Sequence, residues 1–392
     1  MRTLIYGGSF NPPHKGHVAA VKAALEQKHV DRVLIIPSGT PPHKVLAGDS
    51  PDSRQRLELC HLAFDGIRGA EICDIEISHD DVDYTANTLR TLSEMYPEDE
   101  FSLLVGSDMF FGIDGWYQHE YVLGGREIYA MARNKNETEQ LEKKAAELEK
   151  GFGCRVRILP KKLVVLSSTE VRAALKERGG TDMLPGKVYS SVIAHRWYGA
   201  KPDLAWLRQQ ADELLKPKRI PHVRGCEKMA AALAAKWGED PGRAAEGAIL
   251  HDITKKIKDD EQLRVCEEYG IITDDVERHE TQLLHSKTGA ALARKLFGVD
   301  DGIYDAIFWH TTGRPGMSLM EKILYLSDSM EPTRNYDGVE ELRALAFQDL
   351  DEAMILGLRM SCETVKSRGQ LVYGVTEQAL SWFISLKEDK NL

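Results

Sequence analysis

The feature that most constrains the fold of this chain is a change in its hydrophobic periodicity near residue 198. Before that point, short apolar runs alternate with stretches of helical spacing, and after it only helical periods follow. Strands that alternate with helices are typical of a parallel sheet covered on both faces. We therefore predict an α/β domain with a parallel sheet over residues 1–198 and an all-α domain over residues 203–392.

The same periods predict the individual elements. Strands are expected at residues 2–6, 32–37, 71–77, 101–105, 128–132 and 156–159. Helices of the second half are expected at residues 203–216, 223–237, 242–249, 260–268, 287–297, 301–308, 318–329, 338–346, 350–367 and 375–386. A charge-rich helix over residues 137–150 lacks a wide apolar stripe, so we expect it to lie in solvent.

Composition limits the function classes. With 51 basic and 61 acidic residues the formal charge is -10, which argues against a surface that binds a nucleic-acid duplex. No apolar run approaches the ~18 residues of a membrane span. The six cysteines form no CxxC pair, so neither a thiolate zinc site nor a disulfide framework is indicated. We expect a cytoplasmic protein with no nucleic-acid or membrane partner, for which an oligomer stays open.

The strongest chemical signal follows the first predicted strand, at residues 7–17, with the sequence Gly-Gly-Ser-Phe-Asn-Pro-Pro-His-Lys-Gly-His. Glycines at a strand end let the backbone approach a ligand closely. His14 and His17 stand where a helix begins, and unpaired N–H groups make such a helix end a phosphate site. The alternative is a Gly/Pro turn with two incidental surface histidines, which accounts poorly for the whole combination.

A second signal is the segment Ser-Ser-Thr-Glu-Val-Arg at residues 167–172, directly after an apolar run. Taken alone, a Ser/Thr cluster before a helix most often serves as a cap. Arg172 is expected to face the same way as Ser168, one turn earlier, and to supply a permanently charged fork for phosphate.

Together these motifs resemble bacterial nicotinate mononucleotide adenylyltransferases, over residues 1–198. Pro-Pro-His-Lys at 41–44, Tyr-Thr at 84–85 followed by Thr88, Gly-Ser-Asp at 106–108 followed by Trp116, and Arg133 also match that family's pattern. The resemblance implies a Rossmann-like nucleotidyltransferase that joins the phosphate of nicotinate mononucleotide to the α-phosphorus of ATP, with Mg²⁺ accompanying ATP. Positioning two anions and stabilising negative charge is most of that task.

The resemblance also implies roles for individual residues. His14, His17, Lys44 and Arg172 would act on the ATP phosphates, with His17 the most important in the transition state. Substrate would be bound by Gly7, Gly8, Ser9, Phe10, Thr85, Gly106, Asp108, Trp116, Arg133, Ser167, Ser168 and Thr169. Among these, Asp108 would hold the ATP ribose, Thr85 and Trp116 the pyridine ring, and Arg133 the mononucleotide phosphate.

The helical half carries a second constellation of histidines and aspartates in the order His222, His251-Asp252, His285, His310 and Asp328. A single His-Asp pair is weak evidence, but ligands on successive helices would converge in the core of a bundle. Imidazole and carboxylate without thiolate suit iron, manganese or cobalt. Six ligands exceed the needs of one ion, which favours two metals bridged by Asp252. The alternatives are that His285 merely begins a helix and that His310 merely ends one.

This half resembles the HD phosphohydrolases, closest to bacterial enzymes that cleave diadenosine tetraphosphate symmetrically, over residues 203–385. Further matches are Thr-Thr-Gly-Arg at 311–314 and Glu331-Pro332 with Arg334, while the surroundings of His222 depart from the pattern. The resemblance implies one metal on His222, His251, Asp252 and Asp328 and a second on Asp252, His285 and His310. It also implies phosphate binding by Lys255, Arg314 and Arg334.

The sequence thus predicts a bifunctional enzyme whose partners are ATP, nicotinate mononucleotide and diadenosine tetraphosphate or related nucleotides. Two alternatives stay open for the second domain. It could sense a nucleotide without cleaving it, or it could act on another nucleotide phosphate.

Overall fold

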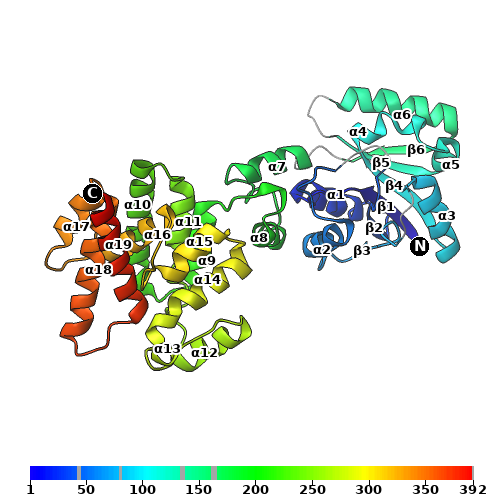
Figure 1. Ribbon diagram of the computed structural model, residues 1–392. Helices are drawn as coiled ribbons and strands as arrows, with labels where there is room; N and C mark the ends of the chain where they lie inside the picture. Colours follow the sequence, from blue (N-terminus) through cyan, green and yellow to red (C-terminus); the bar gives the residue numbers. More distant parts are fainter. Residues whose placement is uncertain (42–45, 79–81, 133–136, 160–165, 391–392) are drawn as a thin grey trace. The chain divides into compact units, whose positions relative to one another are not determined.

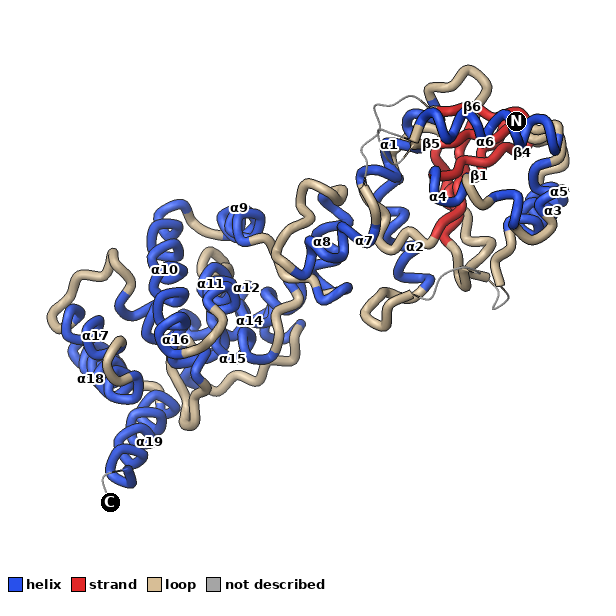
Figure 2. Tube along the Cα trace, turned by 90° about the horizontal axis from the view of Figure 1, so that it is seen from above, coloured by secondary structure: helices blue, strands red, loops and turns tan. Residues whose placement is uncertain are grey.

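The computed structural model describes residues 1–41, 46–78, 82–132, 137–159 and 166–390, with residues 389 and 390 described by their backbone alone. The chain forms two compact units, Met1–Lys201 and Pro202–Leu392. Figures 1 and 2 show strands in the first unit and helices throughout the second. Each unit has a hydrophobic core of its own.

The first unit contains one six-stranded parallel sheet in the order β3-β2-β1-β4-β5-β6. Its strands are β1 (Arg2–Gly8), β2 (Arg32–Pro37), β3 (Ala70–Ile72), β4 (Glu100–Gly106), β5 (Glu127–Met131) and β6 (Arg155–Ile158). The order reverses between β1 and β4, so their following loops run to opposite sides. In such sheets a crevice opens at this point, outside the carboxyl ends of the strands.

Helices cover both faces of the sheet, and this explains why its strands are nearly continuous apolar runs. Along β1, Leu4 and Tyr6 face one core cluster, whereas Ile5 faces the other. The helical segments are α1 (Lys15–Leu25), α2 (Ser53–Phe64), α3 (Thr85–Met95), α4 (Ser107–Phe110), η1 (Ile113–Gly115), α5 (His119–Leu123), α6 (Thr138–Phe152), α7 (Ser168–Lys176), α8 (Gly186–His195) and η2 (Trp197–Gly199).

Two predicted elements of this unit need correction. The strand expected over residues 71–77 ends at Ile72, because Ile77 N–H bonds to Asp74 C=O in a turn instead of joining the sheet. The helix expected to lie in solvent, α6, has a buried side: Leu141 and Leu148 pack into the core at helical spacing. A narrow apolar stripe is therefore enough to pack this helix against the core, while its other faces lie in solvent.

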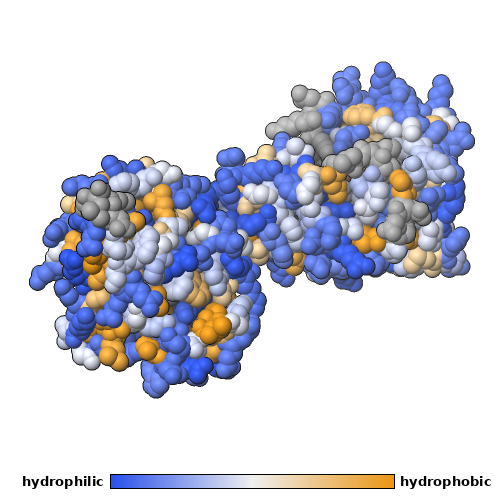
Figure 3. Space-filling view, in the orientation of Figure 1, coloured by the Kyte–Doolittle hydropathy of each residue, from blue (hydrophilic) through white to orange (hydrophobic). Residues whose placement is uncertain are grey.

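The second unit contains helices joined by loops, with no strand among its described residues. Its segments are α9 (Leu204–Leu214), η3 (Pro217–Arg219), α10 (Ile220–Trp237), α11 (Pro241–Leu250), α12 (Asp259–Glu268), α13 (Asp275–His279), η4 (Thr281–Leu283), α14 (Leu284–Phe297), α15 (Asp301–Trp309), α16 (Leu319–Met330), α17 (Val339–Ala346), α18 (Leu350–Ser367) and α19 (Gly374–Lys390). Within this part of the chain and the described first unit, no helix is long and apolar enough to cross a membrane. On the face of each unit seen in Figure 3, apolar patches are small and lie between polar side chains.

Helices α10 and α14 begin about one turn earlier than their periods predict. Pro221 stands at the start of α10, where its missing N–H costs nothing and its fixed φ suits a helix. The longer helices bring His222 and His285 into first turns, on faces that point inward. Both side chains are buried.

Candidate active sites

A cavity of about 340 Å³ opens at the carboxyl ends of β1 and β4, at the reversal of strand order. Most of the predicted substrate residues line it. They are Gly7, Gly8, Ser9, Phe10, Thr85, Gly106, Asp108, Trp116, Ser167, Ser168 and Thr169, and the predicted catalytic residue His17 lines the cavity with them. Lys44 and Arg133 lie outside the described residues. The two sequence motifs, 150 residues apart in the chain, therefore meet at one cavity.

The two histidines of the first motif are locked together at the start of α1. His14 is the N-cap residue: His17 N–H donates to His14 Nδ1 (3.4 Å), and His14 N–H donates to His17 Nδ1 (3.1 Å). The rings stack with centroids 3.6 Å apart. Because both Nδ1 atoms accept, each neutral ring carries its proton on Nε2. The capping pair thus converts both side chains into Nε2–H donors, which is what phosphate oxygens require.

The second motif combines a cap and a contact with the first. Ser167 caps α7 with Glu170 in a reciprocal pair, as its residue type favours. Ser168 Oγ donates to Pro12 C=O (3.3 Å), and an Arg172 guanidinium N–H donates to Asn11 C=O (2.7 Å). The first turn of α7 is therefore fastened to the loop that precedes His14.

Other residues that hold this loop lie far from both motifs in the sequence. Tyr198 is fully buried, and its hydroxyl donates to Asn11 Oδ1 at 2.7 Å. Arg56 is 1% exposed and donates to the carbonyls of Ser9 (2.6 Å) and Ser38 (2.7 Å), at the ends of β1 and β2. The positive charge of Arg56 thus lies against backbone carbonyls next to the cavity. No local pattern marks either residue.

Two buried carboxylates that line the cavity, Glu76 and Asp83, likewise received no role from the sequence. Thr88 Oγ1 donates to Glu76 Oε1 at 2.6 Å, and Asp83 Oδ2 accepts from Thr40 N–H at 2.6 Å. Burial raises the pKa of Glu76 to about 7, against the hydrogen bond from Thr88. Asp83 immediately precedes Tyr84 and Thr85, so its bond to Thr40 fixes the start of the segment that carries Thr85.

In the second unit all six predicted ligands converge. Asp252 is at the centre, 1% exposed, and its two oxygens face different histidines. Oδ2 lies 3.8 Å from His222 Nε2 and 3.6 Å from His251 Nε2. Oδ1 lies 3.3 Å from His285 Nε2 and 4.0 Å from His310 Nε2. One carboxylate therefore stands between two pairs of imidazoles.

Asp328 and three cations complete this centre. Asp328 Oδ1 lies 3.0 Å from His222 Nε2, and Arg334 donates to the same oxygen at 2.8 Å. Lys255 Nζ is 2.9 Å from His285 Nε2. Arg219, which sequence reasoning missed, contacts Asp252.

The ion pairs of Arg314 are with residues outside the set of candidate metal ligands. Its guanidinium is paired with Glu321 at 2.6 Å and with Asp305 at 3.2 Å. Of the three predicted phosphate-binding cations, Lys255 and Arg334 are therefore the ones that contact the ligand set.

The chemistry of the donors fits divalent metal ions. One group of candidate ligand atoms comes from His222, Cys226, His251 and Asp328, and another from His251, Asp252 and His310, each within 4.8 Å of one another. His251 Nε2 is buried and has no hydrogen-bond partner in the described structure. Such an orphaned nitrogen is costly unless something coordinates it. Cys226 was not predicted as part of this group.

The charge states also suit metal binding. Burial lowers the pKa of His251, and it lowers that of His310 to about 3, so both rings are neutral at pH 7. Burial opposes ionisation of Asp252, yet His251 and His285 hold the pKa of that carboxyl well below its usual range. Neutral imidazoles around an ionised carboxylate are the forms that ligate a cation.

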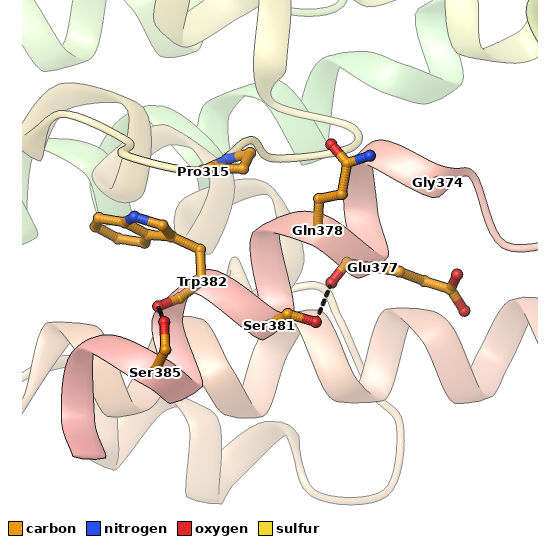
Figure 4. Close-up of a pocket in the computed structure, with 7 residues that line it drawn as sticks. All are labelled: Pro315, Gly374, Glu377, Gln378, Ser381, Trp382 and Ser385. Atoms are coloured by element: carbon orange, nitrogen blue, oxygen red, sulfur yellow. Dashed lines mark hydrogen bonds between the residues drawn. The ribbon is translucent and has the colours of Figure 1, made fainter. Parts of the chain in front are cut away.

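A separate, wide groove runs between α19 and the loop that carries Pro315 (Figure 4). Trp382 offers an apolar surface there, but the hydroxyls of Ser381 and Ser385 donate to backbone carbonyls of their own helix. Glu377 supplies the one carboxylate among the residues that line the groove. The groove lacks the converging polar groups of the other two sites.

Comparison with known proteins matches each unit separately. The cytidylyltransferase-like family matches residues 5–174, and the HD domain matches residues 219–333. A probable nicotinate-nucleotide adenylyltransferase of Lachnoclostridium phytofermentans is 30% identical over 195 residues, 50% of this chain and 97% of that protein. A symmetrical bis(5'-nucleosyl)-tetraphosphatase of Bacillus subtilis is 34% identical over 183 residues, 46% of this chain and 96% of that protein.

One solved structure is also among the matches. A predicted HD superfamily hydrolase involved in NAD metabolism from Clostridium acetobutylicum is 34% identical, with a TM-score of 0.45. The match covers 46% of this chain and 96% of that one.

Proposed function

Because the chain belongs to the nicotinate-nucleotide adenylyltransferases in its first half and to the HD-domain proteins in its second, we propose that it is a bifunctional enzyme of nucleotide metabolism. The first unit, taken as residues 1–198, would transfer AMP from ATP to nicotinate mononucleotide. The second, taken as residues 203–392, would hydrolyse diadenosine tetraphosphate to two ADP. The sites share no residue, so each reaction can be tested alone.

Adenylyl transfer is supported by the meeting of His17, Ser168 and Asp108 at one cavity at the strand-order reversal. The phosphate oxygen of nicotinate mononucleotide forms a bond to the α-phosphorus of magnesium-ATP, and the bond to the β-phosphate breaks to release pyrophosphate. His14 and His17 donate Nε2–H to the phosphates, with Lys44 and Arg172 adding positive charge. The gain is electrostatic stabilisation of a transition state, with no covalent nucleophile.

The remaining residues of the cavity position the two substrates. Asp108 accepts from the ATP ribose, and Gly7 and Gly8 admit the adenosine against bare backbone. Thr85 and Trp116 enclose the pyridine ring on the far side, and Arg133 holds the mononucleotide phosphate. A carboxylate on the ring accepts from N–H donors that an amide NH₂ would oppose, so we infer a preference for nicotinate over nicotinamide.

A substrate panel on the full chain tests this assignment. The expected result is a kcat/KM at least tenfold higher with nicotinate mononucleotide than with nicotinamide mononucleotide, and no turnover of phosphopantetheine. Equal values for the acid and the amide would overturn the specificity, and turnover of phosphopantetheine would overturn the assignment of the first unit.

Hydrolysis by the second unit is supported by the placement of Asp252 between two pairs of histidines. His222, His251, Asp252 and Asp328 would hold one divalent ion, and Asp252, His285 and His310 the other. When bound, iron, manganese or cobalt would polarise the phosphoryl group and lower the pKa of water. Lys255 and Arg334 would neutralise the polyphosphate at the centre, with Arg314 farther along the chain of phosphates.

Product analysis decides where the tetraphosphate is cut. With Mn²⁺ or Co²⁺ supplied, we expect ADP as the single product of diadenosine tetraphosphate. AMP plus ATP would refute symmetrical cleavage. If the unit binds the nucleotide but shows no turnover with iron, with manganese and with cobalt, it would be identified as a sensor.

A further inference from the structure

The four candidate ligand histidines of the second unit are each held at Nδ1, which leaves Nε2 to face the centre. Three of them use a main-chain carbonyl three residues earlier. His251 Nδ1 bonds to Ala248 C=O at 2.7 Å, His310 Nδ1 to Ile307 C=O at 2.7 Å, and His285 Nδ1 to Gln282 C=O. These bonds are built into the helix ends and cannot be removed by side-chain substitution.

His222 is the exception. Its Nδ1 lies 3.1 Å from Oε1 of Glu331, a carboxylate 109 residues away that is fully buried. Glu331 is itself fixed, because Thr333 N–H donates to its Oε2 at 2.7 Å and Thr333 Oγ1 donates to its Oε1. Of the four imidazoles, His222 is thus the one whose Nδ1 faces a carboxylate.

A glycine makes this contact sterically feasible. Gly225 lies one turn after His222 on α10, and a Cβ at that position would overlap Glu331 Oε2. The next nearest atoms, Cδ and Cβ of Glu331, would lie at 3.1 and 3.3 Å, so the whole side chain would have to move. A glycine in mid-helix costs about 0.5–1 kcal/mol relative to alanine. Here it lets a buried carboxylate pack directly against the helix.

We propose that Glu331 is a positioning residue that holds His222 with Nε2 directed at the metal centre, and that Gly225 is the residue that lets it do so. The inference rests on the proposed metal site of the second unit. A carboxylate that accepts from Nδ1–H fixes the tautomer and ring orientation and makes Nε2 a stronger donor to a cation. Nε2 of His222 already lies 3.0 Å from Oδ1 of Asp328, another ligand assigned to that ion.

The test is a Mn²⁺ titration of the full-length chain by calorimetry, with activity not needed as the readout. Loss of an outer partner of a ligating histidine typically weakens metal binding 10–100-fold. We expect about a tenfold loss for Glu331→Gln, which keeps an acceptor but loses the charge, and a larger loss for Glu331→Ala. The melting temperature of each metal-free variant is measured alongside.

Two matched controls separate positioning from burial. Glu227→Gln neutralises a different buried carboxylate, on α10, which pairs with Arg208 at 2.6 Å. Gly247→Ala adds a methyl group to a helical glycine where the nearest atom would be 3.5 Å away. Both should bind Mn²⁺ as the unmodified chain does, whereas Gly225→Ala should weaken binding as Glu331→Ala does.

A double-mutant cycle gives the decisive comparison. In a His222→Ala background, Glu331→Ala should change Mn²⁺ affinity no further, because the ring that it positions is gone. Unchanged affinity in Glu331→Gln and Glu331→Ala would overturn the inference while leaving the metal site intact. Absence of Mn²⁺ binding by the unmodified chain would overturn the metal site and the inference together.

Discussion

Removal of His17 should separate the catalytic and the structural contributions of one imidazole. Nδ1 of His17 accepts from His14 N–H and completes the cap of α1, while Nε2 carries the proton assigned to phosphate. His17→Ala removes both functions. His17→Asn keeps an amide oxygen near the position of Nδ1 but has no donor at the position of Nε2.

The magnitudes differ for the two functions. Loss of one transition-state donor commonly costs about 100-fold or more in kcat, about 2.7 kcal/mol, so both variants should fall by that amount in adenylyl transfer. Loss of one hydrogen bond, here from His14 N–H to His17 Nδ1, costs about 1 kcal/mol of stability. That cost should appear in His17→Ala and be largely absent in His17→Asn.

The assay is release of pyrophosphate from ATP with saturating nicotinate mononucleotide, together with urea unfolding of each variant. Hydrolysis of diadenosine tetraphosphate by the second unit serves as the internal control and should stay unchanged. A fall in kcat of less than threefold in His17→Asn would refute the assignment of Nε2–H to the phosphates. A fall confined to His17→Ala would show that the cap alone matters.

Further outcomes are expected elsewhere. Asp252→Asn should abolish hydrolysis of diadenosine tetraphosphate and leave at most one bound metal ion per chain by elemental analysis, with adenylyl transfer intact. Tyr198→Phe leaves Asn11 Oδ1 buried without its donor, which should cost about 1–3 kcal/mol in unfolding of the first unit, measured by urea titration. Burial raises the pKa of Glu76 from 4.5 to about 7, so the folded state binds a proton more tightly than the unfolded state there. Stability should therefore fall as pH rises from about 4.5 to 7, by up to about 3 kcal/mol, and Glu76→Gln should flatten that dependence.

The sheet strands could be predicted within a few residues because strands buried on both faces are continuous apolar runs. β3 shows the limit of that signal. Residues 73–77 alternate as a strand would, but the hydrogen bond from Ile77 N–H closes a turn on Asp74. The strand order β3-β2-β1-β4-β5-β6 could not be predicted from the sequence either, because periodicity identifies strands but does not show which strands are neighbours.

For the sites, the sequence predicted residues that sit in contiguous motifs and missed those that act from a distance. His14 and His17 can be recognised from their spacing and from the glycines that precede them. Arg56, Tyr198 and Glu76 touch the same region through contacts that only the folded chain creates. Glu331 stood in a matching motif without a role, and its contact with His222 gives it one.

Both candidate sites use the same property of imidazole in opposite directions. At the start of α1, main-chain N–H groups donate to Nδ1 of His14 and His17, so the remaining nitrogen of each ring is a proton donor suited to phosphate. In the helical unit, a carbonyl oxygen accepts from Nδ1 of His251 and a carboxylate oxygen accepts from Nδ1 of His222. The Nε2 atom of each ring therefore carries a lone pair that can bind a metal ion. The polarity of the group behind the ring thus decides which chemistry the ring can perform. Removal of the negative charge of Glu331 should therefore weaken metal binding at His222, although no metal ligand is altered.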